Sequence, residues 1–246
     1  MRLTDRVALV GSGKFGFSMT NDFDCHVYLL DGGSELAMID AGVGLETDRI
    51  LENVSRDGFD PARITKVLLT HAHADHCGGS AVWNTSLNAV VALHDAETAF
   101  LECADEEQTG LRLARSGGWY PEDYRLTACE VGLKLQHGQE LSVGELKVRA
   151  LHVPGHSRGS VCYAVSDART ACLFTGDTVF LNGEIGLLNC VGSTLADYRD
   201  HIHRLSELAV DCVFPGHRAV ILSKGQRHLD RAIKNLKGLV PPENLF

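Results

Sequence analysis

The stretch Leu68-Leu69-Thr70-His71-Ala72-His73-Ala74-Asp75-His76-Cys77-Gly78-Gly79 places four metal-binding side chains within six residues, directly after an apolar segment. His71 and His73 are separated by a single residue, so in an extended loop both side chains project to the same side. The side chains of Asp75 and His76 are expected to point to a second position beside the first. Gly78 and Gly79 permit a tight turn into a helix. One loop of this kind can therefore supply ligands to two metal ions.

Three later loops follow the same plan, in which an apolar strand is followed by a glycine and a candidate ligand. They are Pro154-Gly-His156, Thr175-Gly-Asp177 and Pro215-Gly-His217. The glycine lets the backbone swing the next side chain into a crowded centre. Asp40 ends another strand, and we expect it to accept a hydrogen bond from a ligand histidine.

This order of motifs, HxHxDH followed by PGH, TGD and PGH, resembles the metallo-β-lactamase-fold superfamily from about residue 25 to residue 217. The resemblance implies an αββα four-layer sandwich, in which two mixed β-sheets pack face to face with helices on both outer sides. It implies that one metal ion takes His71, His73 and His156, that another takes Asp75, His76 and His217, and that Asp177 bridges them. Two divalent ions are implied, with zinc expected first, although these ligand types also suit iron and manganese.

The reaction that the resemblance implies is hydrolysis, and the layout is most similar to the glyoxalase II-like branch. A hydroxide bridging the two metals would be the nucleophile, and Asp75 would guide a proton to the leaving group. The substrate would be a small acyl ester, thioester or lactone. The metals, two carboxylates and hydroxide leave a formal charge of about +1, which would attract a carboxylate on the substrate.

Two alternatives within the same fold stay open. Persulfide dioxygenases also carry a THxHADH stretch, and they use a single iron with a subset of these ligands. A non-catalytic relative that binds a small metabolite would usually have lost ligands, and none is lost here. Among hydrolase substrates, glutathione thioesters are disfavoured, because residues 179–189 contain no Arg or Lys and only 29 residues follow His217.

The organisation of the chain is that of a single domain over residues 1–246, because no linker or low-complexity tract interrupts it. Strands are expected over Arg6–Val10, Cys25–Asp31, Glu35–Asp40, Ile64–Thr70, Ala89–His94, Glu145–Leu151, Ser160–Val165, Ala171–Thr175 and Val210–Phe214. Helices are expected over 44–57, after Gly79, within 95–115, near Thr194 and over 223–238. Capping boxes are predicted at Thr194 and Ser223, and the last helix has apolar positions Leu229, Ile233, Leu236 and Val240.

Residues 95–130 are expected to cover the strand ends, either as a helical lid over the site or as an ordinary helical layer. Aromatic walls for a substrate pocket would come from Trp119, Tyr120 and Tyr124. Arg112 or Arg115 could pair with an anionic group of the substrate. Trp119, Tyr120 and Tyr124 are thus candidate residues of a substrate pocket.

A glycine pattern near the N-terminus, Gly11-x-Gly13-x-x-Gly16, copies the start of a dinucleotide-binding fingerprint. That function requires a helix to begin there, whereas the polar stretch Phe17–Asp24 lacks helical periodicity. We therefore predict a strand-to-strand loop that reaches toward the mouth of the site. His26 follows this loop and is a further candidate for the rim of the pocket.

The composition limits the partners of the protein. Lys and Arg number 23 against 32 Asp and Glu, so the formal charge of −9 disfavours nucleic acid and anionic membranes. The eight cysteines form no CxxC pair, and no apolar run reaches the length of a membrane span or resembles a secretory signal. We expect a cytoplasmic protein with reduced thiols that acts on a small molecule, with a homodimer as the default assembly.

Overall fold

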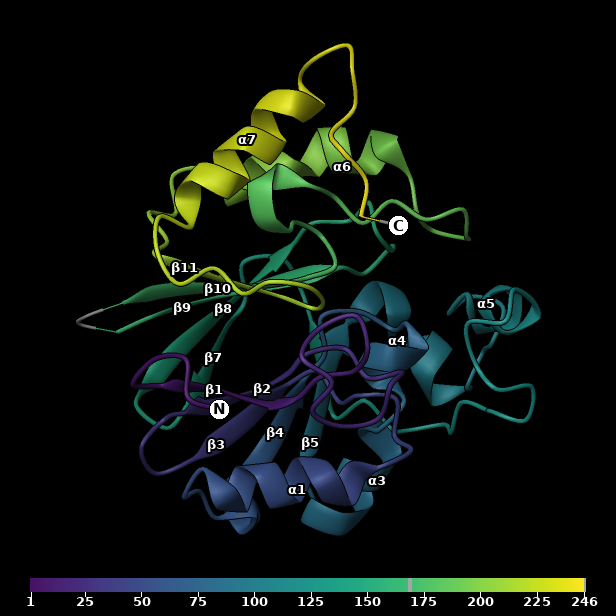
Figure 1. Cartoon of the computed structure of the whole chain (residues 1–246), viewed down its shortest axis with the longest axis vertical. Coiled ribbons are helices and arrows are strands. Elements are labelled where there is room, and N and C mark those ends of the chain that lie inside the picture. Colours follow the sequence, from purple (N-terminus) through teal and green to yellow (C-terminus); the bar gives the residue numbers. More distant parts are fainter. Residues whose placement is uncertain (168–169, 246) are drawn as a thin grey trace.

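The computed structural model describes residues 1–167 and 170–245, and two β-sheets lie face to face at its centre (Figure 1). The first sheet has the order β1-β2-β3-β4-β5-β6. Its strands are β1 (Val7–Gly11), β2 (Val27–Asp31), β3 (Leu36–Ile39), β4 (Ile64–Leu68), β5 (Val90–His94) and β6 (Leu133–Leu135). Strands β1 to β3 pair antiparallel and β3 to β6 pair parallel, so the sheet is mixed as predicted.

The second sheet has the order β11-β10-β9-β8-β7. Its strands are β7 (Glu140–Val143), β8 (Leu146–His152), β9 (Val161–Ser166), β10 (Ala171–Gly176) and β11 (Cys212–Pro215). Only the β10–β11 pair is parallel among these neighbours. Strands β8, β10 and β11 therefore run in one direction, and the loops that follow them emerge at the same edge of the sheet.

The alternation of side chains along the strands divides the apolar core into layers. On β2, Val27 and Leu29 face the outer helices, whereas Tyr28 and Leu30 face the second sheet. Between the sheets, the Tyr28 ring packs on Phe174 of β10 and on Phe214 of β11, with ring centroids 5.4 Å away in both cases. Burial of these rings fixes how the two sheets are placed against each other.

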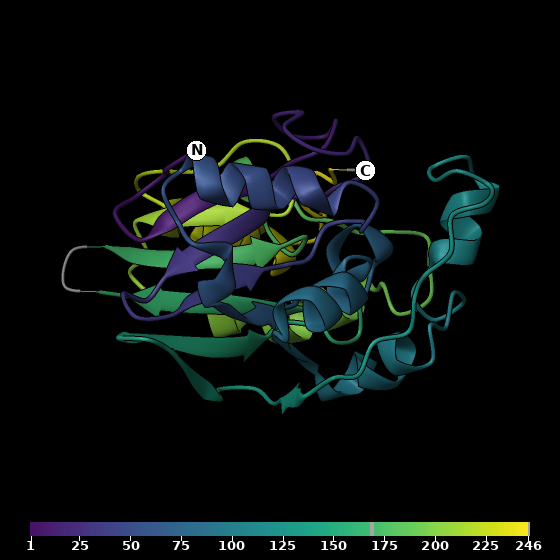
Figure 2. The same cartoon turned by 90° about the horizontal axis from the view of Figure 1, so that it is seen from below.

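Helices cover both outer faces of the sandwich (Figure 1). Helices α1 (Thr47–Arg56) and α3 (Ser80–Leu87) lie on the first sheet, and α6 (Leu195–His201) and α7 (Gln226–Leu236) lie on the second. The short α2 (Ala74–Cys77) and α4 (Asp95–Glu102) flank the strand ends, and Figure 2 shows α5 (Leu111–Ser116) standing out on one side. The αββα architecture is confirmed. Short 3-10 helices span Pro61–Arg63, Leu181–Gly183 and Ile202–Leu205.

Two details of the predicted helices need correction. Thr194 does cap α6, since its hydroxyl accepts a hydrogen bond from the Asp197 N–H at 3.0 Å. The capping box at Ser223 is wrong, because α7 begins after Gly225 and has no side-chain cap. Val240 is also wrong as a buried position of this helix: α7 ends at Leu236, and Val240 is 75% exposed.

The Gly11-x-Gly13-x-x-Gly16 pattern opens a loop, as predicted. No helix lies between β1 and β2, and both strands pair antiparallel on either side of this loop. Strands β6 and β7 were not predicted, because their short, alternating segments are interrupted by polar residues. None of the helices in 1–167 and 170–245 has the length and apolar character that crossing a membrane requires.

Candidate metal centre

The ends of strands from both sheets meet at one edge of the sandwich. His71 and His73 lie in the loop after β4, and the neighbouring Asp75 and His76 lie on α2. His156 follows β8, Asp177 follows β10 and His217 follows β11. Because these strands end at a common edge, their loops converge, and the seven side chains come together in two groups.

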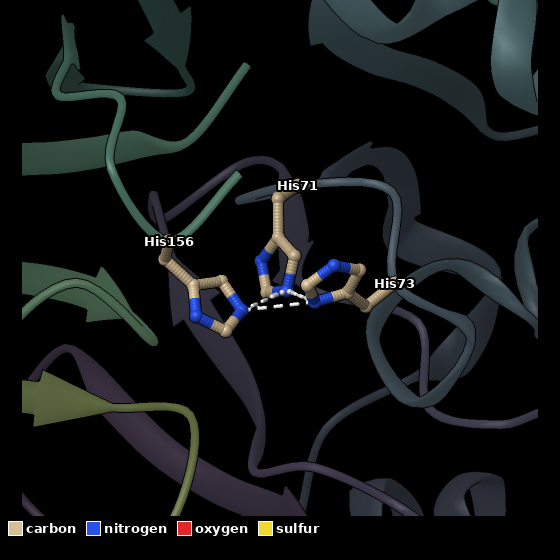
Figure 3. Close-up of side chains that lie close together, drawn as sticks. All are labelled: His71, His73 and His156. Atoms are coloured by element: carbon tan, nitrogen blue, oxygen red, sulfur yellow. Dashed lines mark hydrogen bonds between the residues drawn. The ribbon is translucent and has the colours of Figure 1, made fainter. Parts of the chain in front are cut away.

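The first ligand group consists of His71, His73 and His156 (Figure 3). Nε2 of His71 lies 3.0 Å from Nδ1 of His73, and Nε2 of His156 lies 3.2 Å and 2.9 Å from these two atoms. Nitrogens bound to a tetrahedral zinc ion at 2.0–2.1 Å are about 3.3 Å apart. The three nitrogens therefore form a triangle of nearly the size that one metal ion requires.

The second ligand group consists of Asp75, His76 and His217. Oδ2 of Asp75 lies 3.1 Å from Nε2 of His217 and 3.5 Å from Nε2 of His76. Asp177 stands between the two groups: its Oδ1 is 3.4 Å from His76, and its Oδ2 is 3.4 Å from His217 and 3.7 Å from His156. One carboxylate thus faces both groups.

Two buried atoms of this centre lack hydrogen-bond partners. They are Nε2 of His76 and Oδ1 of Asp177, two of the four such side-chain atoms in the described part of the chain. Burying polar atoms without partners is costly, so native proteins satisfy them or use them. A metal ion would satisfy both atoms at once, and the residues present therefore fit a metal in chemical type and in spacing.

Asp40 lies behind the second ligand group. Its Oδ2 accepts a hydrogen bond from Nδ1 of His76 at 2.8 Å, and its Oδ1 accepts one from the Thr70 N–H at 2.7 Å. Asp40 has φ = 62°, a conformation that costs energy in a residue with a side chain. Asp40 thus adopts a strained backbone conformation and orients the ring of His76. Metal-binding histidines typically donate their other ring N–H to a carboxylate in this way.

The protonation of the two groups differs. Burial, reinforced by neighbouring histidines, lowers the pKa of His73 to about 3 and lowers the pKa of His71 well below its usual value. In the second group, burial acts against the charged form of His217, but the Asp177 and Asp75 carboxylates raise its pKa to about 9. The first group therefore presents neutral imidazoles at pH 7, the form that binds a metal.

A cavity of about 380 Å³ opens onto this centre. His73, Asp75, Asp177 and His217 form its floor. Its walls come mainly from the loop between β1 and β2, from residues 109–120 and from residues 188–190, and they include Lys14, Phe15, Phe23, Leu111, Leu113, Trp119, Tyr120, Leu188 and Cys190. Most of these side chains are apolar, and Lys14 is the only Lys or Arg lining this cavity among the described residues.

A sequence model of the metallo-beta-lactamase superfamily matches residues 20–221. The chain belongs to the metallo-beta-lactamase superfamily. The match includes both ligand groups and Asp177, and it confirms the family resemblance drawn from the sequence.

Relatives in this superfamily include thioesterases. The acyl-coenzyme A thioesterase MBLAC2 of Bos taurus is 31% identical over 211 residues, which is 78% of this chain and 72% of that protein. The probable polyketide biosynthesis zinc-dependent hydrolase BaeB of Bacillus velezensis is 26% identical over 194 residues, with 78% and 72% covered. The solved structure of BJP-1, a subclass B3 metallo-beta-lactamase of Bradyrhizobium japonicum, has a TM-score of 0.72 at 23% identity, covering 95% of this chain and 89% of that one. This last likeness shows the fold.

The predicted pocket residues separate into two pairs. Trp119 and Tyr120 line the cavity. Tyr124 stacks behind Tyr120, and its hydroxyl donates to the Val43 carbonyl at 2.8 Å, so Tyr124 supports the wall from outside. His26 is 1% exposed and does not line the cavity. Of the four residues predicted for the pocket, His26 and Tyr124 therefore do not line this cavity.

His26 instead joins two loops beneath the rim. Its Nδ1 lies 3.1 Å from the Ser12 hydroxyl, and its Nε2 lies 2.8 Å from the Arg218 carbonyl oxygen. The Phe17 ring stacks on it at 5.4 Å. These contacts tie the β1–β2 loop to the loop that carries His217.

Neither arginine predicted as an anion partner lines the cavity. Arg112 forms an ion pair with Glu107, and Arg115 pairs with Glu106 at 2.6 Å. Cys190 also lies in the cavity wall. Of the 95–130 segment, residues 109–120 form one wall, whereas α4 packs against β5 and β6 as an ordinary cover.

Glu97 of α4 is a buried charged residue near the centre that the sequence did not predict. It is 3% exposed, and its two carboxylate oxygens accept hydrogen bonds from the Ala72 N–H at 2.8 Å and the Gly159 N–H at 2.7 Å. Burial raises the pKa of Glu97, and hydrogen bonds from Ser157, Gly159 and Ala72 act against that rise. In the sequence, an acidic residue in the first turn of a helix is ordinary, so no signal marks it.

Proposed function

We propose that this protein is a metal-dependent thioesterase with a dinuclear centre, acting on an acyl thioester whose acyl group is apolar. The observation that carries the proposal is the opening of one apolar cavity onto two facing ligand groups. The MBLAC2 relatives, named acyl-coenzyme A thioesterases, support the thioester among the ester, thioester and lactone substrates considered. Membership of the glyoxalase II-like branch stays a prediction.

The residues divide between two metal ions in this proposal. His71, His73 and His156 would hold one ion, and Asp75, His76 and His217 would hold the other. Asp177 would contact both, because its Oδ2 lies near His156 of the first group and His217 of the second, and its Oδ1 lies near His76. Two such ions lower the pKa of water to near neutrality and polarise a carbonyl oxygen. Zinc suits these ligands, and the relative BaeB is named zinc-dependent.

The chain itself supplies orientation and proton handling. Asp40 holds the ring of His76, and Tyr120 donates a hydrogen bond to Oδ1 of Asp75 at 3.1 Å. Oδ1 of Asp75 therefore lies at the border of the cavity, where it can pass a proton to the departing thiol sulfur. The apolar walls exclude bulk water from the acyl group and thereby strengthen the local electrostatic interactions.

The cavity favours an apolar acyl group over a charged one. Phe15, Phe23 and Trp119 offer ring surface, and the aromatic pairs Phe15–Trp119 and Phe23–Tyr120, with centroids 5.8 Å and 5.7 Å apart, join its two main walls. Lys14 provides a single positive charge on the lining, which is available to an anionic group on the thiol part of the substrate.

The test combines metal analysis with a substrate panel. We expect about two zinc ions per chain in protein purified without chelators, and release of free thiol from apolar acyl thioesters, lost with a chelator and restored by zinc. Asp177→Ala should lose both metal and turnover. One iron per chain with oxygen consumption on a persulfide would favour the dioxygenase alternative. Two metals without turnover on thioesters, esters and lactones would favour the non-catalytic alternative.

A further inference from the structure

We infer that Glu97 is a positioning residue that sets the distance between the two loops of the first ligand group. The inference rests on the proposed function, because it concerns the metal affinity of His71, His73 and His156. Both carboxylate oxygens of Glu97 accept hydrogen bonds from backbone N–H groups of the loops that carry these rings. Its action on a metal would therefore be indirect.

The first step of the argument is where the two oxygens of Glu97 go. Oε2 accepts from the N–H of Ala72, the residue between His71 and His73. Oε1 accepts from the N–H of Gly159, three residues after His156. One buried carboxylate thus bonds to both loops that supply the first ligand group, and these loops leave strands of different sheets.

The second step is how closely the loops approach the carboxylate. A Cβ atom added to Gly159 would lie 2.8 Å from Cγ of Glu97 and 2.9 Å from its Cδ, which is closer than side-chain atoms approach one another. Gly159 therefore permits the loop after His156 to press against Glu97. The neighbouring Val161 N–H donates to the Thr70 carbonyl at 2.8 Å, which joins the same two loops from the other side.

The third step is what Glu97 does not touch. The second ligand group is braced by other residues, since Asp40 contacts His76 and Tyr120 contacts Asp75. The Thr70 hydroxyl is shared, since it lies 3.0 Å from Nδ1 of His71 and 3.4 Å from Nδ1 of His76. The bonds of Glu97, in contrast, go to the two loops of the first group. If Glu97 sets the loop spacing, its loss weakens metal binding at the first group and leaves the second group nearly unchanged. A residue that only stabilised the fold would affect both groups alike.

The test uses zinc as the probe and two backgrounds that isolate the groups. His217→Ala leaves the first ligand group complete, and His73→Ala leaves the second complete. Glu97→Gln keeps the shape of the side chain but turns an amide NH₂ toward one of the two N–H donors. We expect it to lower zinc affinity about tenfold or more in the His217→Ala background, and less than about twofold in the His73→Ala background.

Glu102→Gln is the matched control, because Glu102 lies on the same helix and contacts Lys134 at the surface. It should leave both affinities unchanged. Equal loss in both backgrounds, or no loss in either, would overturn the role of Glu97. Absence of zinc binding by the wild-type protein would instead contradict the proposed function.

Hydrogen exchange of the backbone amides in the metal-free wild-type protein is a second test, and it does not depend on the folding of a variant. The N–H groups of Ala72 and Gly159 lie in loops, yet their bonds to a buried carboxylate predict exchange as slow as that of strand amides. Fast exchange of either amide would overturn the inference. In Glu97→Gln or Glu97→Asp, faster exchange is expected at these two positions, while the amides of β4 and β9 stay protected.

Discussion

The hydroxyl of Tyr120 lies 3.1 Å from Oδ1 of Asp75, while Oδ2 of the same carboxylate lies 3.1 Å from His217. The Tyr120 ring is held between Phe23 and Tyr124, whose ring centroids are 5.7 Å and 5.4 Å away. The rotation of the Asp75 carboxylate is thus fixed from the cavity wall, and one of its oxygens is left for the second ligand group.

Tyr120→Phe removes this hydrogen bond and retains the ring. We expect zinc affinity at the second ligand group to fall about tenfold, because groups that orient metal ligands have effects of this size. Turnover should fall with it, since the carboxylate loses its fixed orientation. Zinc titration in the His73→Ala background measures the first effect, and thioester kinetics on the otherwise unaltered chain measure the second.

Tyr124→Phe is the control for that experiment. Its hydroxyl bonds to the Val43 carbonyl and its ring stacks on Tyr120, so it shares the surroundings of Tyr120 without the contact to Asp75. An equal loss of zinc affinity in Tyr124→Phe would mean that packing, and not the hydrogen bond to Asp75, is responsible.

Asp177→Asn tests whether one carboxylate serves both groups. The substitution keeps the size of the side chain but removes its charge and turns an NH₂ toward one ligand group. We expect the zinc content to fall from about two ions per chain to about one or fewer, and turnover to fall about 100-fold or more, since the shared negative charge is lost. Elemental analysis and thioester kinetics measure both.

The control for Asp177 is Asp200→Asn, an exposed aspartate on α6. It removes the same charge from the chain at a place remote from the ligands. Full metal content and rate in Asp177→Asn, matching those of Asp200→Asn, would contradict the bridging role.

The sequence predicted the residues that gather at this edge because HxHxDH directly follows an apolar strand, and each of the three later ligands comes after an apolar strand and a glycine. Convergence of strand ends then brings His71, His156, Asp177 and His217 to one edge without further information. The same logic could not find Glu97, since its partners are main-chain N–H groups 25 and 62 positions away. Because every residue except proline has a main-chain N–H, the amino-acid types at positions 72 and 159 do not indicate these hydrogen bonds.

His26 and Ser223 show two other limits of the sequence. His26 precedes a strand at the correct edge, but its ring turns toward Ser12 and the Arg218 carbonyl, which only the packing of two loops determines. Ser223 has the spacing of a cap, but the helix begins three residues beyond it, at Gln226, because the Gly225 N–H bonds to the Asp211 carbonyl. In both cases a tertiary contact overrides a local pattern.

Leu113→Ala tests the apolar wall of the cavity. Leu113 lines the cavity and is 57% exposed, and Leu222 is an equally exposed leucine, at 53%, that does not line it. We expect Leu113→Ala to raise the KM for a thioester with a large apolar acyl group about three- to tenfold, from the loss of roughly 1 kcal/mol of apolar contact, with kcat nearly unchanged. Leu222→Ala should leave both constants unaltered.

The acyl group can be varied in the same experiment. For an acetyl thioester, whose acyl group has little apolar surface to bury, Leu113→Ala should have a much smaller effect on KM. An equal change for acetyl and large acyl thioesters, or an equal change in Leu222→Ala, would mean that the cavity does not bind the acyl group.

His94 predicts a pH dependence of stability away from the metal centre. Its ring stacks on His152 with centroids 3.8 Å apart, and burial, followed by the charge of His152, lowers the pKa of His94 to about 4 from a usual 6.5. Between these two values the unfolded chain binds a proton that the folded chain does not. Protonation therefore favours unfolding, and stability falls as the pH drops from about 6.5 toward 4.

His94→Asn isolates this contribution. Nδ1 of His94 accepts the Ala96 N–H at the start of α4, and asparagine is a good residue at that capping position but does not titrate. The free energy of unfolding of the metal-free wild-type protein should fall relative to that of His94→Asn by on the order of 1 kcal/mol between pH 7.5 and 4.5. Denaturant unfolding across this range measures the difference, and parallel curves would show that His94 is protonated equally in the folded and unfolded chains.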